Sequence, residues 1–403
     1  MIFNDIFIFN ADSDLAIANK YPHYMPPARI RKMNSDLEAL SIYLAEADDL
    51  ILLRRALPGE FQTQTSDLLG YDLHTYSYNH LDKIEALKYR YLKPWGWSPQ
   101  IHQALSLIKG FADTDYAQHP SLHWSDHSRF ISGKGIVCDV LPKVLQKLSP
   151  VKASISPEKI STIEDLERYV SKKHAVVKAP WSSSGKDVRF MIQNKMEKME
   201  LEWSHGIFKQ QGFVTAAQYV EKIQDFAMQF YMDESGNVTY KDLSLFFTND
   251  YGQYQGNYIL TDSQIEEILC KYITKEELYQ VRSVIIDSLK DVINKSYIGY
   301  FGVDMMIFRD EDGQYRIHPM VEINLRNNMG ILAACIRNKI VYPRSRGKYY
   351  VDFESDASTL GQKVQQLEKE YPLQISEGKI TKGFYRLTPD YSDAQYIAYI
   401  IID

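Results

Sequence analysis

The chain has 403 residues, enough for two or three domains, and its 45% hydrophobic and 24% charged residues are values of globular rather than disordered proteins. A net charge of −6 without a long basic block gives no indication of a nucleic-acid partner. The three cysteines, Cys138, Cys270 and Cys335, are far apart and lack metal-site spacing, which favours free thiols in a reducing compartment.

The N-terminal region predicts alternating strands and helices. Residues 5–9 predict a buried strand, residues 34–47 have apolar positions at helical spacing behind a Ser/Asp start, and two further strands are predicted within 48–57 and 71–78. Such a βαβ beginning implies a parallel sheet covered by helices. The loop after the first strand has no glycine, so the dinucleotide fingerprint is missing and we expect a substrate platform rather than a nicotinamide-binding domain.

The same N-terminal residues bear on localisation. "MIFNDIFIFN" is interrupted by Asp5 and has no basic leader, so we expect no signal peptide. No window approaches 18 consecutive apolar residues, so we also expect no membrane span and a cytoplasmic protein.

The centre of the chain predicts a change from helices to antiparallel strands. Residues 85–150 are expected to be mainly helical, and a capped helix within 156–173 starts at Ser161 or Thr162. Strands are then predicted within the ranges 174–180, 188–193, 215–233 and 238–249.

The C-terminal part predicts one or two helices within 261–295, followed by a long hairpin. The hairpin spans residues 297–326 with its turn at 310–313, and a last strand pair lies within 382–389 and 394–403.

The returning strand of this hairpin carries an unusual row of polar residues, in "HPMVEINLRNNMG". Glu322, Asn324 and Arg326 occupy alternate positions and so share one face, and Asp304 lies amid apolar residues on the first strand. Carboxylate and amide oxygens are the ligands that Mg²⁺ prefers, and substrate phosphates and water complete its coordination. The structural alternative is that Asp304 pairs with Arg326 or Arg316 and that Glu322 is an edge-strand charge.

A second polar segment, "VVKAPWSSSGKDV", places Lys178 on a strand before a loop rich in hydrogen-bond donors. The N–H and O–H groups of such a loop can surround phosphate oxygens. The segment is not a Walker A loop, because Lys186 is followed by Asp187. Serine-glycine runs are also common in plain loops, and the pairing with an upstream lysine and the later hairpin is what makes this one informative.

Together these segments resemble the ATP-grasp superfamily over residues 125 to 335, in the family's order. The matching features are a strand lysine before a Ser/Gly loop, a linker that grips adenine ("QYVEKIQDF"), and a late hairpin bearing Asp and then Glu-x-Asn. The resemblance implies a mixed α/β and α+β fold. An N-terminal βαβ domain (1–120) would precede an ATP-grasp domain of two α+β subdomains (121–215 and 216–403).

The resemblance also implies residue roles. The phosphate-binding residues would be Lys134, Lys178, Ser182, Ser183, Ser184, Gly185 and Lys186. The linker backbone at Tyr219, Val220 and Glu221 would bind adenine, and Glu221 or Asp225 would bind ribose. Mg²⁺, with Mn²⁺ as an alternative, would be held by Asp304, Glu322 and Asn324, and the transferred phosphoryl group would face the catalytic residues Arg326 and Lys178. One departure is Asp187, which stands where the family commonly has a second glycine, so we expect a stiffer loop or an acid turned to solvent.

The implied reaction is that of an ATP-dependent, ADP-forming ligase, which activates a carboxylate as an acyl phosphate for attack by an amine or thiol. Phosphoryl transfer needs positioning and charge stabilisation more than a protein nucleophile, which suits these residues. The expected partners are small-molecule carboxylates and amines, with neither nucleic acid nor membrane, and a homodimer is left open. The alternatives are an ATP-grasp kinase and a nucleotide-binding module without turnover.

The N-terminal loops are the expected place for the acceptor. Asp12 and Asp14 could bind an amine, and Arg29 and Arg31 could bind a carboxylate. The alternative is that all four are charged loop residues exposed to solvent.

Overall fold

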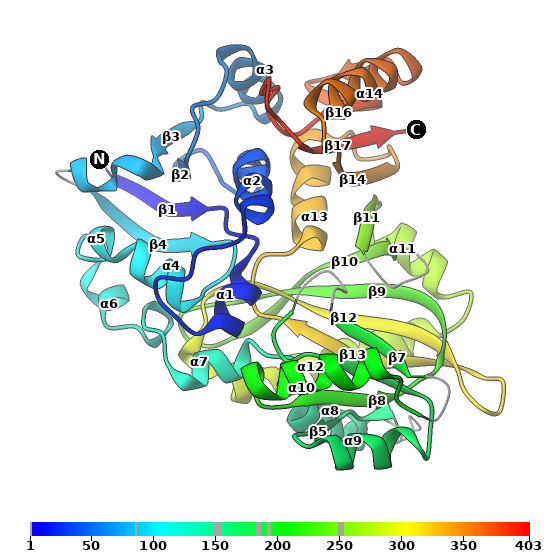
Figure 1. Ribbon diagram of the computed structural model, residues 1–403. Helices are drawn as coiled ribbons and strands as arrows, with labels where there is room; N and C mark the ends of the chain where they lie inside the picture. The colour runs from blue at the N-terminus through cyan, green and yellow to red at the C-terminus, as the bar shows by residue number, and fades with distance from the viewer. Residues whose placement is uncertain (1, 85–86, 149–154, 183–186, 192–194, 249–253) are drawn as a thin grey trace.

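The computed structural model describes residues 2–84, 87–148, 155–182, 187–191, 195–248 and 254–403. Their strands form three sheets, two of four strands and one of nine. Figure 1 shows the N-terminal sheet beside the C-terminal strands, with the remaining strands and their helices below them. In the described part of the chain, no helix has both the length and the apolar character that a membrane crossing needs.

The N-terminal sheet is parallel, in the order β3-β2-β1-β4. Its strands are β1 (Ile2–Ile8), β2 (Leu50–Leu53), β3 (His74–Ser77) and β4 (Lys88–Pro94). The first three confirm the prediction. The fourth corrects it, because residues 85–150 were expected to be mainly helical. In β4 the buried Tyr89 and Tyr91 alternate with the exposed Lys88 and Arg90, which is the period of a strand.

Helices follow β4 as expected: α4 (Pro99–Ala104), α5 (Ser106–Lys109), α6 (Thr114–Ala117), α7 (Asp126–Ile131) and α8 (Ile136–Lys147).

The helix predicted within 34–47 begins earlier and ends earlier. After the short α1 (Ser13–Asn19), helix α2 spans Ala28–Leu37 and a 3₁₀ segment covers Glu38–Tyr43. Pro27 precedes the first turn, where proline suits a helix start. Asn34 and Asp36 do not cap a helix, because their side chains are used in contacts with other segments: Asn34 Oδ1 accepts from Ala11 N, and Asp36 Oδ2 accepts from Gln395 N.

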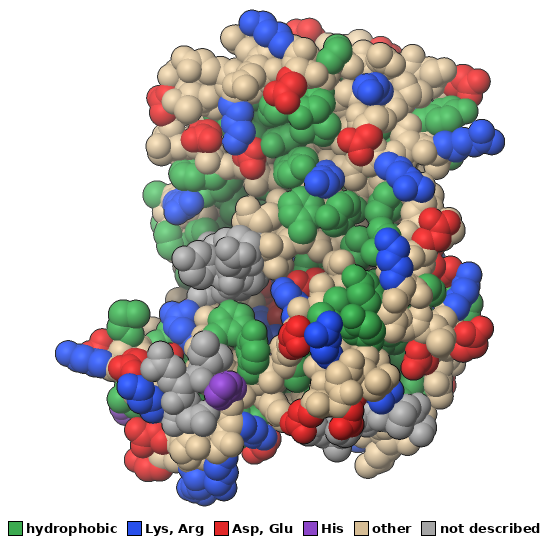
Figure 2. Space-filling view, turned by 90° about the vertical axis from the view of Figure 1, so that its right-hand side faces the viewer, with side chains coloured by type: hydrophobic (Ala, Val, Ile, Leu, Met, Phe, Trp, Pro, Cys, Tyr) green, Lys and Arg blue, Asp and Glu red, His purple; other side chains and the backbone are tan. Residues whose placement is uncertain are grey.

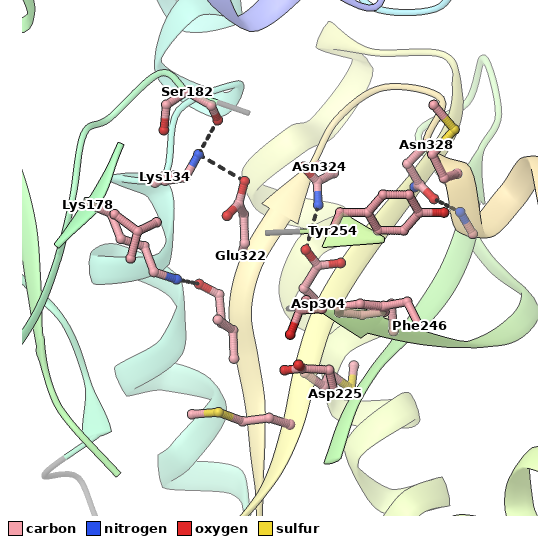
Figure 3. Close-up of a pocket in the computed structure, with 18 of the residues that line it drawn as sticks. Lys134, Lys178, Ser182, Asp225, Phe246, Tyr254, Asp304, Glu322, Asn324 and Asn328 are labelled. Carbon is pink, nitrogen blue, oxygen red and sulfur yellow. Dashed lines mark hydrogen bonds and ion pairs between the residues drawn. The ribbon is translucent and has the colours of Figure 1, made fainter. Parts of the chain in front are cut away.

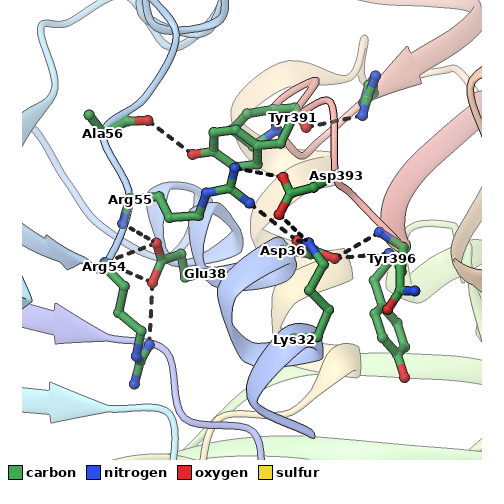
Figure 4. A network of polar contacts seen from close by, with 12 residues as sticks. Lys32, Asp36, Glu38, Arg54, Arg55, Ala56, Tyr391, Asp393 and Tyr396 are labelled. Carbon is green, nitrogen blue, oxygen red and sulfur yellow. Dashed lines mark hydrogen bonds and ion pairs between the residues drawn. The ribbon is translucent and has the colours of Figure 1, made fainter. Parts of the chain in front are cut away.

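Ion pairs hold α2 against the C-terminal strands, as Figure 4 shows. Lys32 Nζ lies 2.6 Å from Asp36 Oδ1 and 3.1 Å from Asp393 Oδ2, and Arg55 Nη2 lies 2.8 Å from the other Asp393 oxygen. A continuous apolar core joins the same regions, since Phe9 and Leu37 cluster with residues of the C-terminal sheet. The N-terminal sheet and the C-terminal strands therefore form one packed unit.

The second sheet is antiparallel, in the order β5-β8-β6-β7. It consists of β5 (Glu158–Ile160), β6 (Ala175–Lys178), β7 (Val188–Met191) and β8 (Val214–Gln218). Helix α9 (Ile163–Val170) starts at Thr162, whose hydroxyl accepts from Asp165 N, so the second of the two predicted caps is the one used. Helix α10 (Lys198–Gln211) had not been predicted.

The third sheet is antiparallel, in the order β13-β12-β9-β10-β11-β14-β17-β16-β15. Its strands are β9 (Glu221–Met232), β10 (Val238–Thr248), β11 (Tyr254–Ile259), β12 (Gly299–Arg309), β13 (Tyr315–Asn324), β14 (Gly347–Phe353), β15 (Gln374–Ser376), β16 (Lys379–Arg386) and β17 (Tyr396–Ile402). The predicted hairpin is β12–β13, and the predicted final pair is β16–β17. The accompanying helices are α11 (Asp262–Leu269), α12 (Lys275–Ile293), α13 (Met329–Ile340) and α14 (Ala357–Glu370).

Candidate active site

A pocket of about 1110 Å³ lies where the three sheets approach one another. Its wall includes Val176 and Lys178 of β6, Asp304 of β12, Glu322 and Asn324 of β13, and residues of the N-terminal region. Figure 2 shows the molecule from the side, hollowed between its upper and lower parts. Pockets for a single small ligand commonly measure about 300–1,000 Å³, so the volume of this one lies just above that range.

The polar row of β13 faces this pocket, as its alternation predicted. Glu322, Asn324 and Arg326 all line the wall, and Asp304 lies opposite Glu322 across the hairpin. The Asn324 amide donates to Asp304 Oδ2 at 3.0 Å, and Arg326 Nε donates to Asp14 Oδ2 at 3.1 Å. The two arginines of the structural alternative are engaged elsewhere, since Arg316 bonds Asp310 at 3.0 Å.

Two lysines approach the same row from the second sheet and from the segment before α8 (Figure 3). Lys134 Nζ lies 3.0 Å from Glu322 Oε1 and donates to the Ser182 carbonyl at 2.5 Å. Lys178 Nζ reaches the Val321 carbonyl at 3.5 Å. The structure thus brings Lys134, Lys178, Ser182 and Glu322 together. The predicted loop residues Ser183, Ser184, Gly185 and Lys186 lie outside the described residues.

Burial and mutual electrostatic interactions shift the pKa values of Asp304, Glu322 and Lys178. Burial, and then the charge of Glu322, raise the pKa of Asp304 to about 7. Burial also opposes the ionisation of Glu322, but Lys134 and Lys178 outweigh it, so the pKa of Glu322 lies below its usual value. Burial lowers the pKa of Lys178 despite the nearby carboxylates. Of the two carboxylates, Asp304 is therefore the one whose negative charge is less well compensated by nearby positive charges.

At the other end of the pocket, the linker between β8 and β9 meets an apolar slot. Tyr219, Val220 and Asp225 line this end, together with Val188, Phe190, Ala217, Met305, Met306 and Met320. Glu221, the alternative ribose ligand, does not line the pocket and lies 3.8 Å from Arg309. Of the two acids proposed from the sequence, only Asp225 lines the pocket.

His318 was missed by the sequence reasoning, although it begins the segment that drew attention to the hairpin. Its ring is buried and lines the pocket, and its Nδ1 has no hydrogen-bond partner among the described residues. Burial, with the charge of Lys178, lowers the pKa of His318 to about 3, so the imidazole is neutral. A neutral ring nitrogen offers a ligand one donor or acceptor in an otherwise apolar wall.

A cluster of uncharged polar side chains was also missed. Gln229 Nε2 donates to Ser244 Oγ at 3.0 Å, and Asn328 Nδ2 donates to Gln229 Oε1 at 3.0 Å. Gln229 does leave a signal in the sequence, since it interrupts the apolar run "FAMQFYM" of a strand that is otherwise buried. Arg29 and Arg31, considered for carboxylate binding, do not line the pocket.

The donor set suits a divalent cation that arrives with phosphate. Among the described residues, no group of three His, Cys, Asp or Glu side chains is placed to hold a metal by itself. Asp304, Glu322 and Asn324 offer two carboxylates and an amide, which matches the few protein ligands that Mg²⁺ uses beside phosphate and water. The raised pKa of Asp304 fits such a ligand, because a bound cation would supply the charge that it lacks.

We therefore expect Asp304→Asn to stabilise the ligand-free protein, without metal or nucleotide. The stabilisation should be seen only at high pH. Below the ordinary pKa of 3.8 the carboxyl is protonated in both folded and unfolded chains, so its charge costs nothing. As pH rises towards 7 the unfolded chain ionises first, and native stability falls. We expect the variant to exceed the wild type by about 1–2 kcal/mol at pH 8 and to equal it near pH 4.

Urea unfolding at the two pH values checks this result, with the exposed Asp48→Asn as control. Equal stability of wild type and Asp304→Asn at pH 8 would show that Asp304 carries no such cost.

No protein-family model matches the sequence, and the search of curated proteins found no match. Among solved structures, biotin carboxylase from Campylobacter jejuni, solved as a beta-gamma-ATP complex, is similar over 99% of this chain and 87% of its own, with a TM-score of 0.50 and 12% identity. N5-carboxyaminoimidazole synthetase from Staphylococcus aureus, complexed with ADP, is similar over 100% of this chain and 94% of its own, with a TM-score of 0.48 and 12% identity.

At this level of identity the likeness to biotin carboxylase bears on the fold alone. The likeness covers 99% of the chain and so includes its N-terminal parallel sheet, its small antiparallel sheet and its large antiparallel sheet. The mixed α/β and α+β architecture predicted from the sequence is confirmed. The chain has an ATP-grasp fold.

Proposed function

We propose that the protein is an ATP- and Mg²⁺-dependent ligase. It would activate a carboxylate as an acyl phosphate, join it to an amine and release ADP and phosphate. The observation that carries this proposal is the continuity of the pocket. One cavity connects the linker at Tyr219, Lys134 and Lys178, and the N-terminal α1–α2 region. Between them lie Asp304 of β12 and Glu322, Asn324 and Arg326 of β13, which we call the acidic row. A nucleotide and an acceptor can therefore meet at the acidic row.

Each residue has a role that its position supports. Lys178 and Lys134 would bind phosphate oxygens, and Asp225 would bind the ribose. Asp304, Glu322 and Asn324 would hold Mg²⁺, which supplies charge neutralisation between the phosphates when bound. Arg326 would stabilise the transferred phosphoryl group, and Asp14 fixes the direction of its guanidinium through the 3.1 Å bond.

The ion pair between Lys134 and Glu322 fits a site awaiting a charged ligand. At 3.0 Å the two side chains neutralise each other, on a wall where a lone charge would be poorly solvated. Metal-bound triphosphate offers an anion to the lysine and a cation to the glutamate, so neither charge is left alone when the pair opens.

Product analysis tests the proposal. We expect slow ADP release from Mg-ATP alone, and faster release with a pool of small carboxylates, with an acyl phosphate that hydroxylamine traps as a hydroxamate. Adding amines should convert the acyl phosphate to an amide and raise steady turnover. A stable phosphorylated product that accumulates without any amide would contradict the ligase proposal and indicate a kinase. Absence of ADP under all conditions would indicate a binding module.

A further inference from the structure

The pocket continues beyond the acidic row into a chamber between α1–α2 and the start of α13, which we call the acceptor chamber. Its apolar wall includes Leu15, Ile30, Met33, Leu37, Trp95 and Met329. Figure 3 shows Phe246, Tyr254 and Asn328 on the far side of Asp304 and Asn324 from the two lysines. The chamber is therefore separate from the phosphate end but open to the acidic row.

The polar groups of this chamber are mostly uncharged and already bonded to one another. Gln229 bonds Ser244 and Asn328, and the Tyr254 hydroxyl donates to Asn257 Oδ1. A Cβ added at Gly330 would lie 2.4 Å from Gln229 Nε2, so the start of α13 packs closely on this cluster. An amide-lined apolar chamber favours a ligand with an uncharged body, because a second charge there would have no counter-ion.

Asp12 is the exception. Its side chain lines the chamber, the residue is only 5% exposed, and its Oδ1 accepts from Asn34 Nδ2 at 2.7 Å. Among the described residues, no lysine or arginine lies within ion-pair distance of it. The closest charge effect is that of Arg54, which is paired with Glu38 at 3.3 Å (Figure 4). A buried carboxylate without a cation is unfavourable, so its presence needs an explanation.

The presence of the other acids near the pocket is already explained by a partner or by a proposed role. Glu322 pairs with Lys134, Asp225 with Lys222, and Asp304 belongs to the proposed metal site. Asp14, the second acid considered for amine binding, bonds Arg326. Asp12 alone remains for a cation brought by a ligand.

We propose that the acceptor chamber binds a largely apolar primary amine, with its ammonium group against Asp12 and its uncharged body against α1, α2 and Trp95. The amine's role as nucleophile rests on the proposed function. Its position suits that role, because Asp12 lies two residues before Asp14, whose carboxylate bonds Arg326 at the acidic row. The bound amine would thus lie next to the carbon of the acyl phosphate.

The step balances without a further reactant. The ammonium gives one proton to the Asp12 carboxylate, and the free amine attacks the acyl carbon. The C–N bond forms and the bond from carbon to the phosphate oxygen breaks. The nitrogen's second proton leaves with the phosphate, and Asp12 returns its proton to solvent. Acyl phosphate and ammonium thus yield amide, hydrogen phosphate and one proton.

Calorimetric titration of the full chain, with and without a Mg²⁺-bound non-hydrolysable ATP analogue, tests the site. The probes are isoamylamine and phenethylamine, compared with isoamyl alcohol, which lacks the charge, and with taurine and putrescine, which carry a second charge. We expect the two apolar amines to bind, and the other three probes to bind at least about tenfold more weakly.

Asp12→Asn should weaken isoamylamine binding by about 10- to 150-fold and leave binding of the nucleotide analogue unchanged. The new side chain keeps an oxygen for Asn34, so the local hydrogen bond survives. Asp48→Asn, at the exposed end of the same domain, is the matched control.

The outcomes separate this inference from the proposed function. If the analogue binds but the apolar amines bind no better than isoamyl alcohol, the assignment of the chamber is overturned and the nucleotide site stands. If isoamylamine binds equally to Asp12→Asn, the chamber holds it by apolar contact alone and the role of Asp12 is overturned. If the analogue fails to bind, the proposed function fails, whatever the amines do. The comparison of amine with alcohol on the wild type holds even if the variant does not fold.

Discussion

Glu322→Gln is expected to yield a folded protein with its turnover reduced by about 100- to 1,000-fold, the size of effect seen when one electrostatic contact to a reacting group is lost. The substitution keeps the volume and one oxygen but removes the charge that would bind Mg²⁺. In the wild type this carboxylate also faces Lys134 at 3.0 Å, so its loss leaves a buried ammonium without its partner.

The fold should survive because Asp304 compensates. The charge of Glu322 is one cause of the raised pKa of Asp304, so its removal allows Asp304 to ionise and to face the lysines instead. Steady-state ADP release and urea unfolding, measured together, check both parts. Glu221→Gln is the matched control, since Glu221 lies on β9 of the same sheet but outside the pocket, and its turnover should match the wild type. An unfolded Glu322→Gln protein, or one with full turnover, would mean that Glu322 has a structural role only.

Lys178→Ala is expected to weaken Mg-ATP binding by about 10- to 150-fold, the cost of one hydrogen bond to a charged group. Lys178 ends β6 with its ammonium group in the pocket, where it donates to the Val321 carbonyl at 3.5 Å. Since burial lowers its pKa, loss of the charge should not destabilise the fold.

Calorimetric titration with Mg-ATP measures the effect. Lys173→Ala is the control, because Lys173 lies just before β6, over the Tyr169 ring, and does not line the pocket. Equal affinities for the two variants would remove Lys178 from the nucleotide site.

Sequence reasoning found the parts of the site that local patterns encode. Alternation in β13 placed Glu322, Asn324 and Arg326 on one face, because a strand turns every second side chain to the same side. Thr162 was recognised as one of two candidate caps for the same kind of local reason.

What escaped prediction depends on contacts between distant segments. The bond between Asp14 and Arg326 joins residues 312 positions apart, and Gln229, Ser244 and Asn328 meet only because three segments pack together. The start of α2 was misplaced because Ser35 and Asp36 resemble capping residues, whereas in the folded chain the Asp36 carboxylate accepts from Gln395 N. No local pattern distinguishes the two uses.

Sequence patterns also left open which linker acid would face the ribose. Glu221 and Asp225 both lie on β9, four residues apart, so regular alternation would turn both side chains to the same face. The register of β9 against β12 shifts between them, and of the two only Asp225 lines the pocket.

A crystal structure with Mg²⁺ and a non-hydrolysable ATP analogue would test the central claim most directly. We predict phosphates between Lys134 and Lys178, a metal ion on Asp304 and Glu322, the ribose at Asp225 and the base against the linker, with the acceptor chamber left open. A nucleotide bound elsewhere, or a Lys134–Glu322 pair still closed beside it at saturating analogue, would contradict the account.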